Sequence, residues 1–241
     1  MSIIRRIVFL GCLICIVRYG NAQTSSRNYV LSELLLKDSV YTLSQVDQAG
    51  YTEKKSQVSY FDGLGREIQN IFVNGSYSAK DIISFLEYDT HGRQTRTYLS
   101  YPDTGGGTFQ NNAKTELLNY YSVTTPTATS SFPWSEQKYD DSPLNRVIER
   151  SSPGAIWSMG GGHTVKLKTL INDEDEVSLW KVNTNGNCIK DGFYPERTLL
   201  ITLTINENGD TTSQYTDKSG KTILKKTYLG GETLETYYVY D

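Results

Sequence analysis

The sequence has few of the residues that build disulfide cores, metal centres and membrane spans. Its 241 residues include three cysteines and two histidines, and its longest apolar run extends from Ile7 to Val17. That run is too short to cross a bilayer comfortably. Two cysteines lie within it, so the rest of the chain has only Cys188 and cannot form an internal disulfide. Such a chain must be stabilised by packing.

Residues 1–22 have the composition of a secretory signal peptide. Arg5 and Arg6 precede the apolar run, and the small residues Gly20 and Ala22 follow it. We expect cleavage near Ala22 and export to the periplasm, the cell surface or the medium. Lipoprotein processing at Cys12 is the alternative, but it would leave an apolar region of only five residues.

The exported chain is mildly acidic. The first 22 residues contain three arginines and no acid, so the remainder has 21 basic and 27 acidic residues and a formal charge of −6. An acidic chain is a poor partner for nucleic acids and anionic membranes. We therefore expect no nucleic-acid partner, and the absence of a second long apolar run predicts no transmembrane anchor.

Composition and pattern both predict an all-β fold. The 18 tyrosines and many threonines favour strands. Residues 199–205 alternate leucine or isoleucine with threonine, a period typical of a half-buried strand. The turn signal 206–209 then predicts a hairpin that continues to Tyr215. Val165–Lys168 repeats the alternation, and 183–186 predicts another turn.

One segment has a helical pattern. Residues 112–121 place apolar side chains on one face, and Asn111 or Asn112 can cap the first turn. The Thr/Ser/Pro-rich stretch 122–133 follows and predicts an insertion. We therefore expect an all-β fold with minor α content: a twisted antiparallel sheet of hairpins in one domain, 23–241, with one short helix near 112–121.

A short motif recurs along the chain. Segments 60–66, 88–93 and 216–221 each contain an aspartate, two further residues, a glycine and a basic residue. The aspartate can accept backbone N–H groups and the glycine can adopt positive φ, so each segment predicts a hairpin turn. A longer copy, 139–146, has asparagine in place of glycine. The predicted turn residues are Asp62, Gly65, Arg66, Asp89, Gly92, Arg93, Asp140, Asn145, Arg146, Asp217 and Gly220.

The arginines of these turns, Arg66, Arg93 and Arg146, occupy the same place in three copies. This position predicts that their stems pack on the sheet and that each guanidinium pairs with a carboxylate of a neighbouring hairpin.

These units resemble YD repeats, and the chain as a whole resembles the N-terminal domain of unknown function of Bacteroidota RHS repeat-associated proteins. The resemblance extends through Ser142–Glu149, 153–154, Gly162–Lys166 and Thr236–Asp241. It implies an exported scaffold, the N-terminal cap or lead segment of a YD-repeat shell. In related polymorphic toxins such a shell wraps a C-terminal effector. The final Tyr240-Asp241 would begin a further unit, as expected for a truncated lead segment whose partner is its own continuation or a separate shell.

Catalytic and cofactor motifs are scarce. His91 lies within a predicted turn, and His163 follows three glycines that lack the lysine of a phosphate-binding loop. We therefore predict no catalytic residue, no metal site and no cofactor. A hydrolase using His163 is a further hypothesis, although no nucleophile motif accompanies it.

Trp134, Trp157 and Trp180, together with strand tyrosines, suggest an alternative function, a carbohydrate- or envelope-binding module at the cell surface. Filling the core is the preferred role for these side chains, because aromatic residues supply much of the buried area in β proteins.

Overall fold

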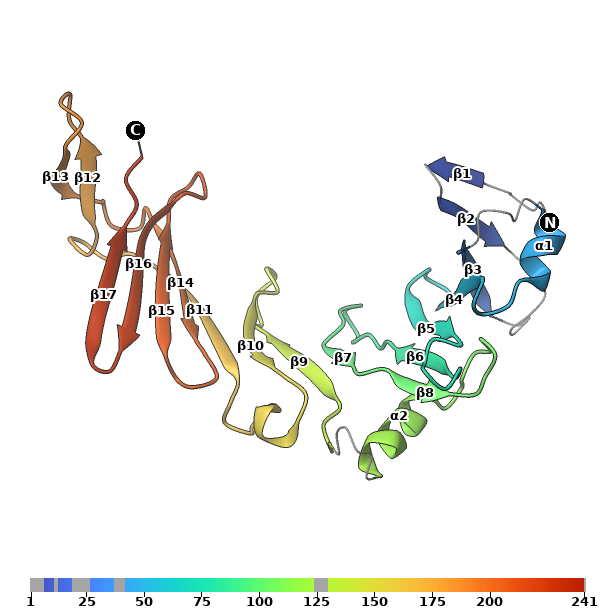
Figure 1. The fold of residues 1–241 in the computed structure, drawn as a ribbon. Coiled ribbons are helices and arrows are strands. Elements are labelled where there is room, and N and C mark those ends of the chain that lie inside the picture. The colour runs from blue at the N-terminus through green and yellow to red at the C-terminus, as the bar shows by residue number, and fades with distance from the viewer. Residues whose placement is uncertain (1–6, 11–12, 19–26, 37–41, 124–129, 241) are drawn as a thin grey trace. The chain divides into compact units, whose positions relative to one another are not determined.

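The computed structural model describes residues 7–10, 13–18, 27–36, 42–123 and 130–240 (Figure 1). It confirms a mostly β chain with antiparallel sheets and, in these residues, two α-helices. The chain divides into two compact units, Met1–Trp134 and Ser135–Asp241. No described helix is long and apolar enough to span a membrane.

The first unit contains an antiparallel sheet of order β1-β2-β3-β4-β5-β6-β8. A three-residue strand, β7, precedes β8 in the chain. The strands are β1 (Ile7–Leu10), β2 (Leu13–Arg18), β3 (Asn28–Leu35), β4 (Lys54–Phe61), β5 (Glu67–Val73), β6 (Asp81–Phe85), β7 (Arg96–Tyr98) and β8 (Tyr101–Asp103).

One face of this sheet forms the core of the first unit. The register aligns Leu31, Val58, Ile71, Ile83 and Tyr101 in one row across β3, β4, β5, β6 and β8. The last four of these side chains are buried together with Leu117 of α2 (Ala113–Ser122). Because successive strand residues point to opposite faces, the next row, which includes Ser59 of β4 and Ser84 of β6, lies on the other face.

A glycine-containing loop, 104–112, also covers the core face and is held by buried polar side chains. The Gly107 N–H donates to Asp81 Oδ2 at 2.7 Å, and the Tyr60 hydroxyl donates to the Gly107 carbonyl at 2.7 Å. Gln69 exchanges two hydrogen bonds with the backbone of Gln110. Buried polar groups need such partners, so these contacts fix the loop in place.

The helices partly match the sequence expectation. α2 confirms the predicted helix, and Asn112 is its N-cap residue, but the Asn112 side chain makes no capping hydrogen bond. The six-residue α1 (Leu43–Gln48) was missed. Its signal was the pair Thr42 and Gln45, which form a capping box.

The second unit contains antiparallel strands in the order β17-β16-β15-β14-β11-β10-β9. A separate two-stranded hairpin, β12-β13, and a 3₁₀ turn (Ala155–Trp157) complete the unit. The strands are β9 (Trp134–Tyr139), β10 (Val147–Ser151), β11 (Val165–Ile171), β12 (Ser178–Val182), β13 (Cys188–Phe193), β14 (Leu200–Ile205), β15 (Thr211–Thr216), β16 (Thr222–Leu229) and β17 (Glu232–Tyr237).

The predicted hairpin at 199–215 is confirmed as β14 and β15. Ile201, Tyr215 and Leu224 align across β14, β15 and β16 and are buried. The neighbouring row on the opposite face contains the paired residues Thr169 and Thr202, and both are exposed. The alternation of leucine or isoleucine with threonine therefore reflects one covered and one open face.

Segment 172–199 leaves the sheet between β11 and β14 and is closed at its base by a buried asparagine. The Asn172 Oδ1 accepts the N–H groups of Thr198 and Leu199 at 3.0 and 2.7 Å, and its amide donates to the Pro195 carbonyl. Val177, from the same segment, is fully buried in the core of this unit.

Two sequence predictions fall partly outside the described residues. Within the expected signal peptide, 1–22, only 7–10 and 13–18 are described, as β1 and β2. In the expected insertion, 122–133, residues 124–129 are not described. Both therefore stay predictions.

Candidate functional site

The turn at 62–66 joins β4 to β5 and shows how the repeated motif works. Asp62 Oδ1 accepts the N–H groups of Leu64 and Arg66, both at 2.9 Å. The Asp62 N–H donates to the Arg66 carbonyl, and the Gly65 N–H donates to the Asp62 carbonyl. Gly65 has φ +78°. The carboxylate oxygen takes the place of water as the hydrogen-bond acceptor of these amides. Gly65 adopts the left-handed backbone conformation that the turn requires.

The turns at 89–93 and 140–146 repeat this arrangement. Asp89 Oδ1 accepts the N–H groups of His91 and Arg93 at 2.9 and 2.8 Å. In the longer copy, Asp140 Oδ1 accepts the Arg146 N–H and also the hydroxyl proton of the inserted Ser142. Asn145 takes the glycine position with φ +49°. The two extra residues therefore preserve the closure of the turn.

The arginines pair differently from the prediction. The Nε atoms of Arg66, Arg93 and Arg146 each donate at 2.8 Å to Oδ2 of the aspartate in the same turn, rather than to a carboxylate of a neighbouring hairpin. For Arg66 and Arg146 the expectation was wrong, because the Asp side chain accepts backbone N–H groups through one oxygen and offers the other to the arginine four or six residues later.

These contacts lower the pKa of all three aspartates. For Asp62 and Asp89 the largest cause is the backbone N–H of the arginine, and for Asp140 it is the side chain of Arg146. Each donor favours the ionised carboxylate. The turns are therefore built around a charged aspartate.

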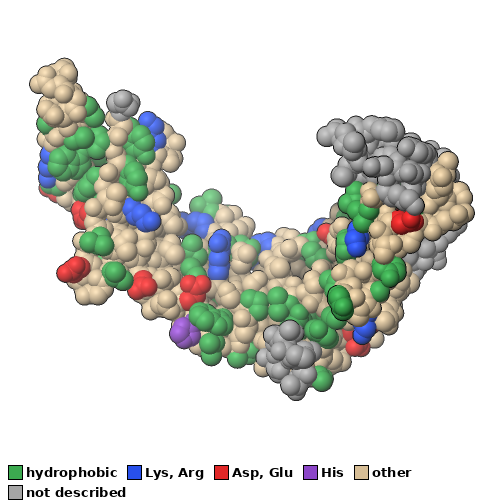
Figure 2. Space-filling view, viewed as in Figure 1, with side chains coloured by type: hydrophobic (Ala, Val, Ile, Leu, Met, Phe, Trp, Pro, Cys, Tyr) green, Lys and Arg blue, Asp and Glu red, His purple; other side chains and the backbone are tan. Residues whose placement is uncertain are grey.

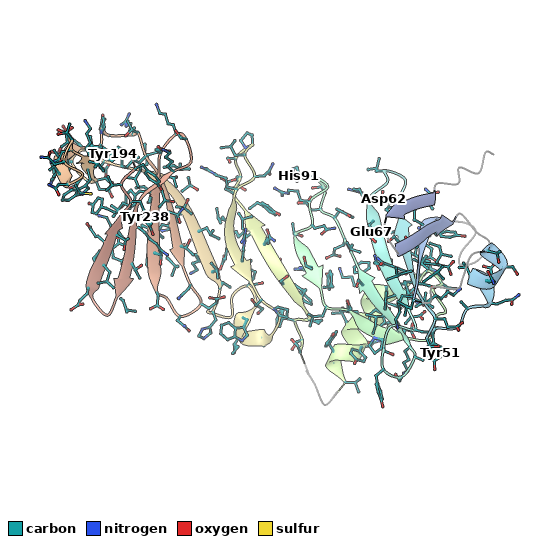
Figure 3. The ribbon with its side chains drawn as sticks, turned by 45° about the horizontal axis from the view of Figure 1, so that its top comes forward. Tyr51, Asp62, Glu67, His91, Tyr194 and Tyr238 are labelled. Carbon is teal, nitrogen blue, oxygen red and sulfur yellow. The ribbon has the colours of Figure 1, made fainter. Side chains whose placement is uncertain are left out.

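A tyrosine joins the first turn to the second. The Arg66 guanidinium carbon lies 4.5 Å from the centre of the Tyr88 ring, and the Tyr88 hydroxyl donates to the Glu67 carbonyl at 2.8 Å. Tyr88 directly precedes Asp89. Figure 3 shows Asp62 and Glu67 close together at one end of β4 and β5 and His91 on the following turn. We call this pair of contacts, cation over ring and hydroxyl to carbonyl, the tyrosine latch.

The second unit repeats the tyrosine latch. Lys221 is the basic residue of turn 217–221, and its Nζ lies 4.7 Å from the centre of the Tyr240 ring. The Tyr240 hydroxyl donates to the Thr222 carbonyl at 2.9 Å. Glu67 and Thr222 each directly follow the basic residue. The same contact thus occurs at two places far apart in the sequence.

Turns 183–187 and 206–210 have the same backbone with asparagine in the first position. Asn206 Oδ1 accepts the N–H groups of Asn208 and Asp210, and Gly209 has φ +90°. Turn 183–187 is built likewise. The sequence predicts turns at both places, and their relation to the aspartate motif was missed. The signal was the shared spacing, Asp or Asn followed three residues later by glycine.

Turn 76–80 is a serine version that sequence reasoning missed. The Lys80 N–H donates to Ser76 Oγ at 2.7 Å, and Ala79 has φ +54°. Neither residue matches the Asp/Asn and Gly pattern, so the spacing of the motif gives no signal for this turn.

A partly buried cluster links α2 to the sheet region of the first unit. Glu87 accepts hydrogen bonds from the Tyr98 hydroxyl and the Lys114 ammonium, both at 2.6 Å. Burial would raise the pKa of Glu87, but the hydrogen bonds from Lys114 and Tyr98 lower it below its ordinary value. Glu87 therefore links Lys114 of α2 to Tyr98 of β7 through an ion pair and a hydrogen bond.

The histidines lie apart from any reactive arrangement in the described residues. His91 is exposed on its turn, beside Asp89. His163 shares a hydrogen bond between its Nδ1 and the Glu207 carbonyl, and its ring packs against Trp157. In the described residues, no hydroxyl or thiol forms a hydrogen bond with His163. These residues also contain no group of three His, Cys, Asp or Glu side chains that could hold a metal ion.

The tryptophans each pack against other side chains. Trp134 contacts Tyr98 and Phe132 in the first unit. Trp180 contacts Tyr237 in the second. On the face shown in Figure 2, lysine and arginine side chains are spread among other residues and form no continuous basic stripe.

Residues 33–171 match the family described as a domain of unknown function, DUF6443. The chain belongs to the DUF6443 family. Within the matched region lie the turns 62–66, 89–93 and 140–146, whereas turn 217–221 and Tyr240 follow the DUF6443 match. No curated protein matches the chain in sequence.

Proposed function

We propose that this DUF6443 chain is an exported, non-catalytic scaffold, the N-terminal cap or lead segment of a YD-repeat shell of the RHS type. The observation that carries the proposal is the tyrosine latch, which occurs between turns 62–66 and 89–93 and again between turn 217–221 and Tyr240. A contact that fixes one turn on a tyrosine of the following unit suits a chain that extends by adding units, because successive units then contact each other.

The edge strand β17 supports this role. It has six residues, and no described strand pairs with its outer side. Edge strands are commonly protected by proline, lysine, bulges or shortness. β8, an edge strand of the first unit, has three residues and includes Pro102. β17 contains neither proline nor lysine and pairs with β16 in unbroken register. It is therefore well suited to accept another strand.

The register identifies which amides would bind that strand. The Tyr238 N–H donates to the Ile223 carbonyl, next to the pair of Leu224 and Tyr237. Because hydrogen-bonded and non-hydrogen-bonded pairs alternate in antiparallel sheets, the N–H groups of Thr233, Glu235 and Tyr237 face outward. Glu235 already pairs with Lys226 of β16 at 3.1 Å, whereas Glu232 favours a partner strand with lysine or arginine opposite it.

Thr233→Pro tests the proposed docking edge. Proline removes one outward N–H and leaves the pairing with β16 intact. We expect a polypeptide of three Tyr-Asp-x-x-Gly-Arg hairpins to bind the purified protein in calorimetry, and Thr233→Pro to weaken binding about tenfold or more. Thr233→Val, which keeps the N–H, is the matched control. Equal binding by all three proteins, or none by the wild type, would overturn the proposal.

Export rests on the composition of residues 1–22 and has its own test. When the gene is expressed in a bacterium with a general secretory pathway, N-terminal sequencing of the exported protein should give a chain that begins near Gln23. An intact N-terminus that stays in the cytoplasm would contradict export.

A further inference from the structure

A cavity of about 240 Å³ lies in the first unit, at the opposite end of β4 from turn 62–66. Leu31, Val73 and Ala49 supply apolar lining. Tyr51 also lines the cavity, and 59% of its surface is exposed. Figure 3 shows Tyr51 well separated from Asp62 within this unit. The cavity is therefore distinct from the turns and the tyrosine latch.

A partly buried ion pair lies in the polar part of this cavity. Lys54 Nζ donates to Glu33 Oε1 at 2.9 Å and to the Val46 carbonyl at 2.8 Å. The Ser56 hydroxyl donates to the same carboxylate oxygen at 3.4 Å. The side chains of Lys54 and Glu33 are 17% and 5% exposed. Since the two charges compensate each other, the cavity favours a neutral ligand over an ion.

The cavity offers both donors and acceptors. An ammonium has three N–H bonds, and two of those of Lys54 are used by acceptors in the described residues. Asn74 also lines the cavity, and its amide can donate and accept. The Tyr51 hydroxyl has the same dual capacity. A ligand hydroxyl, which also donates and accepts, complements this mixed set better than a pure donor or a pure acceptor.

From this lining we infer a binding site for a neutral, hydroxyl-rich small molecule, a single pyranose unit of a glycan. The C–H face of a sugar ring suits the apolar lining and an exposed aromatic ring such as that of Tyr51, and its hydroxyls suit Lys54, Ser56 and Asn74. Pockets for drug-sized ligands hold about 300–1,000 Å³, so a cavity of about 240 Å³ fits one sugar unit. The inference does not depend on the proposed scaffold role.

Saturation-transfer NMR of the purified protein with free glucose, galactose, mannose and N-acetylglucosamine tests the site. We expect at least one of these sugars to bind with a dissociation constant of about 1 mM, as befits a ligand with few atoms. Binding of none of them at about 10 mM, roughly ten times that constant, would overturn the inference.

Two variants locate the binding. Tyr51→Ala removes an exposed ring, and Asn74→Gly keeps a backbone that already has φ +51°, so both should fold. Each should raise the dissociation constant about tenfold, equivalent to the loss of one good contact. Tyr77→Ala, which removes a fully exposed tyrosine outside the cavity, is the control. Unchanged affinity in both Tyr51→Ala and Asn74→Gly would contradict the site, even if a sugar binds elsewhere.

Discussion

Turns 62–66 and 206–210 have the same backbone but opposite side-chain chemistry. In the first, the carboxylate of Asp62 accepts from the Arg66 guanidinium. In the second, the amide of Asn206 donates to Asp210 Oδ2 at 3.0 Å. In both, Oδ1 of the first residue accepts two backbone N–H groups.

The difference between the two turns separates two roles within the motif, which are closing the turn and pairing with the fifth residue. The acceptor oxygen and the glycine close the turn, and they are common to both versions. In these two turns the choice between aspartate and asparagine follows the fifth residue, because a carboxylate suits arginine and an amide suits aspartate. In the turns with a basic fifth residue, the cation also lies over a tyrosine in two copies. Those turns can therefore contact a following unit.

The largest effect is expected from valine at the glycine positions. Gly65→Val and Gly209→Val should each lower the free energy of unfolding by about 1 kcal/mol or more, because valine resists positive φ. A Cβ at either position meets open space. Gly92→Val should cost more, because its Cβ would lie 3.3 Å from Arg66 Nη1. Urea unfolding gives the three values, and unchanged midpoints would refute the turn geometry.

Acid should weaken the aspartate turns and leave the asparagine turns intact. The folded-state pKa values of Asp62, Asp89 and Asp140 are lowered. Their stabilisation is complete above the unfolded pKa of about 3.9 and is lost as pH falls through the lower folded values. Asp62→Asn should therefore reduce the loss of stability between about pH 5 and about pH 2.

Asn206→Asp is the converse variant. It places a carboxylate beside Asp210, so it should destabilise the protein at neutral pH and recover stability on acidification. Urea unfolding across this pH range measures both variants. Identical pH profiles for wild type, Asp62→Asn and Asn206→Asp would contradict the assignment of charge to these turns.

The tyrosine latch should contribute a smaller amount. Tyr88→Phe removes the hydrogen bond to the Glu67 carbonyl and keeps the ring, at an expected cost of about 1 kcal/mol. Tyr77→Phe, on a fully exposed ring, is the control and should cost almost nothing. Equal stability of the two variants in urea unfolding would show that the hydroxyl contact contributes nothing.

Arg66→Lys should have the smallest effect, about 0.5 kcal/mol, since it keeps the charge of a partly exposed pair. It should nevertheless reduce the coupling between Arg66 and Tyr88, because lysine lacks the planar group that stacks on the ring. A double-mutant cycle with Tyr88→Ala measures that coupling. A coupling energy unchanged by lysine would argue against stacking.

The sequence could predict strands, helices and turns whose pattern lies in residues close together in the chain. The alternation in 199–205 and the helix 112–121 were visible because each has its own period. The Asp and Gly spacing was visible because one turn spans five residues. The pairing of Arg66 with Asp62 was mispredicted, since nothing in the spacing shows which carboxylate oxygen is free.

Contacts between distant residues could not be predicted. Asn172 closes a segment that returns at Leu199, and Asp81 holds Gly107, which lies 26 residues later. Tyr88 reaches back 21 residues to Glu67. The cavity beside Lys54 needs α1, β3 and β5 to meet. Each of these depends on strand order and register, which the sequence pattern leaves open.

Backbone amide exchange at β17 tests the central claim, that this edge accepts a further strand, most directly. In the free protein, the amides of Thr233, Glu235 and Tyr237 should exchange fast and those of Leu234 and Thr236 slowly. Adding the polypeptide of three Tyr-Asp-x-x-Gly-Arg hairpins should slow the first three. Fast exchange that persists with the polypeptide present at saturating concentration would contradict the claim.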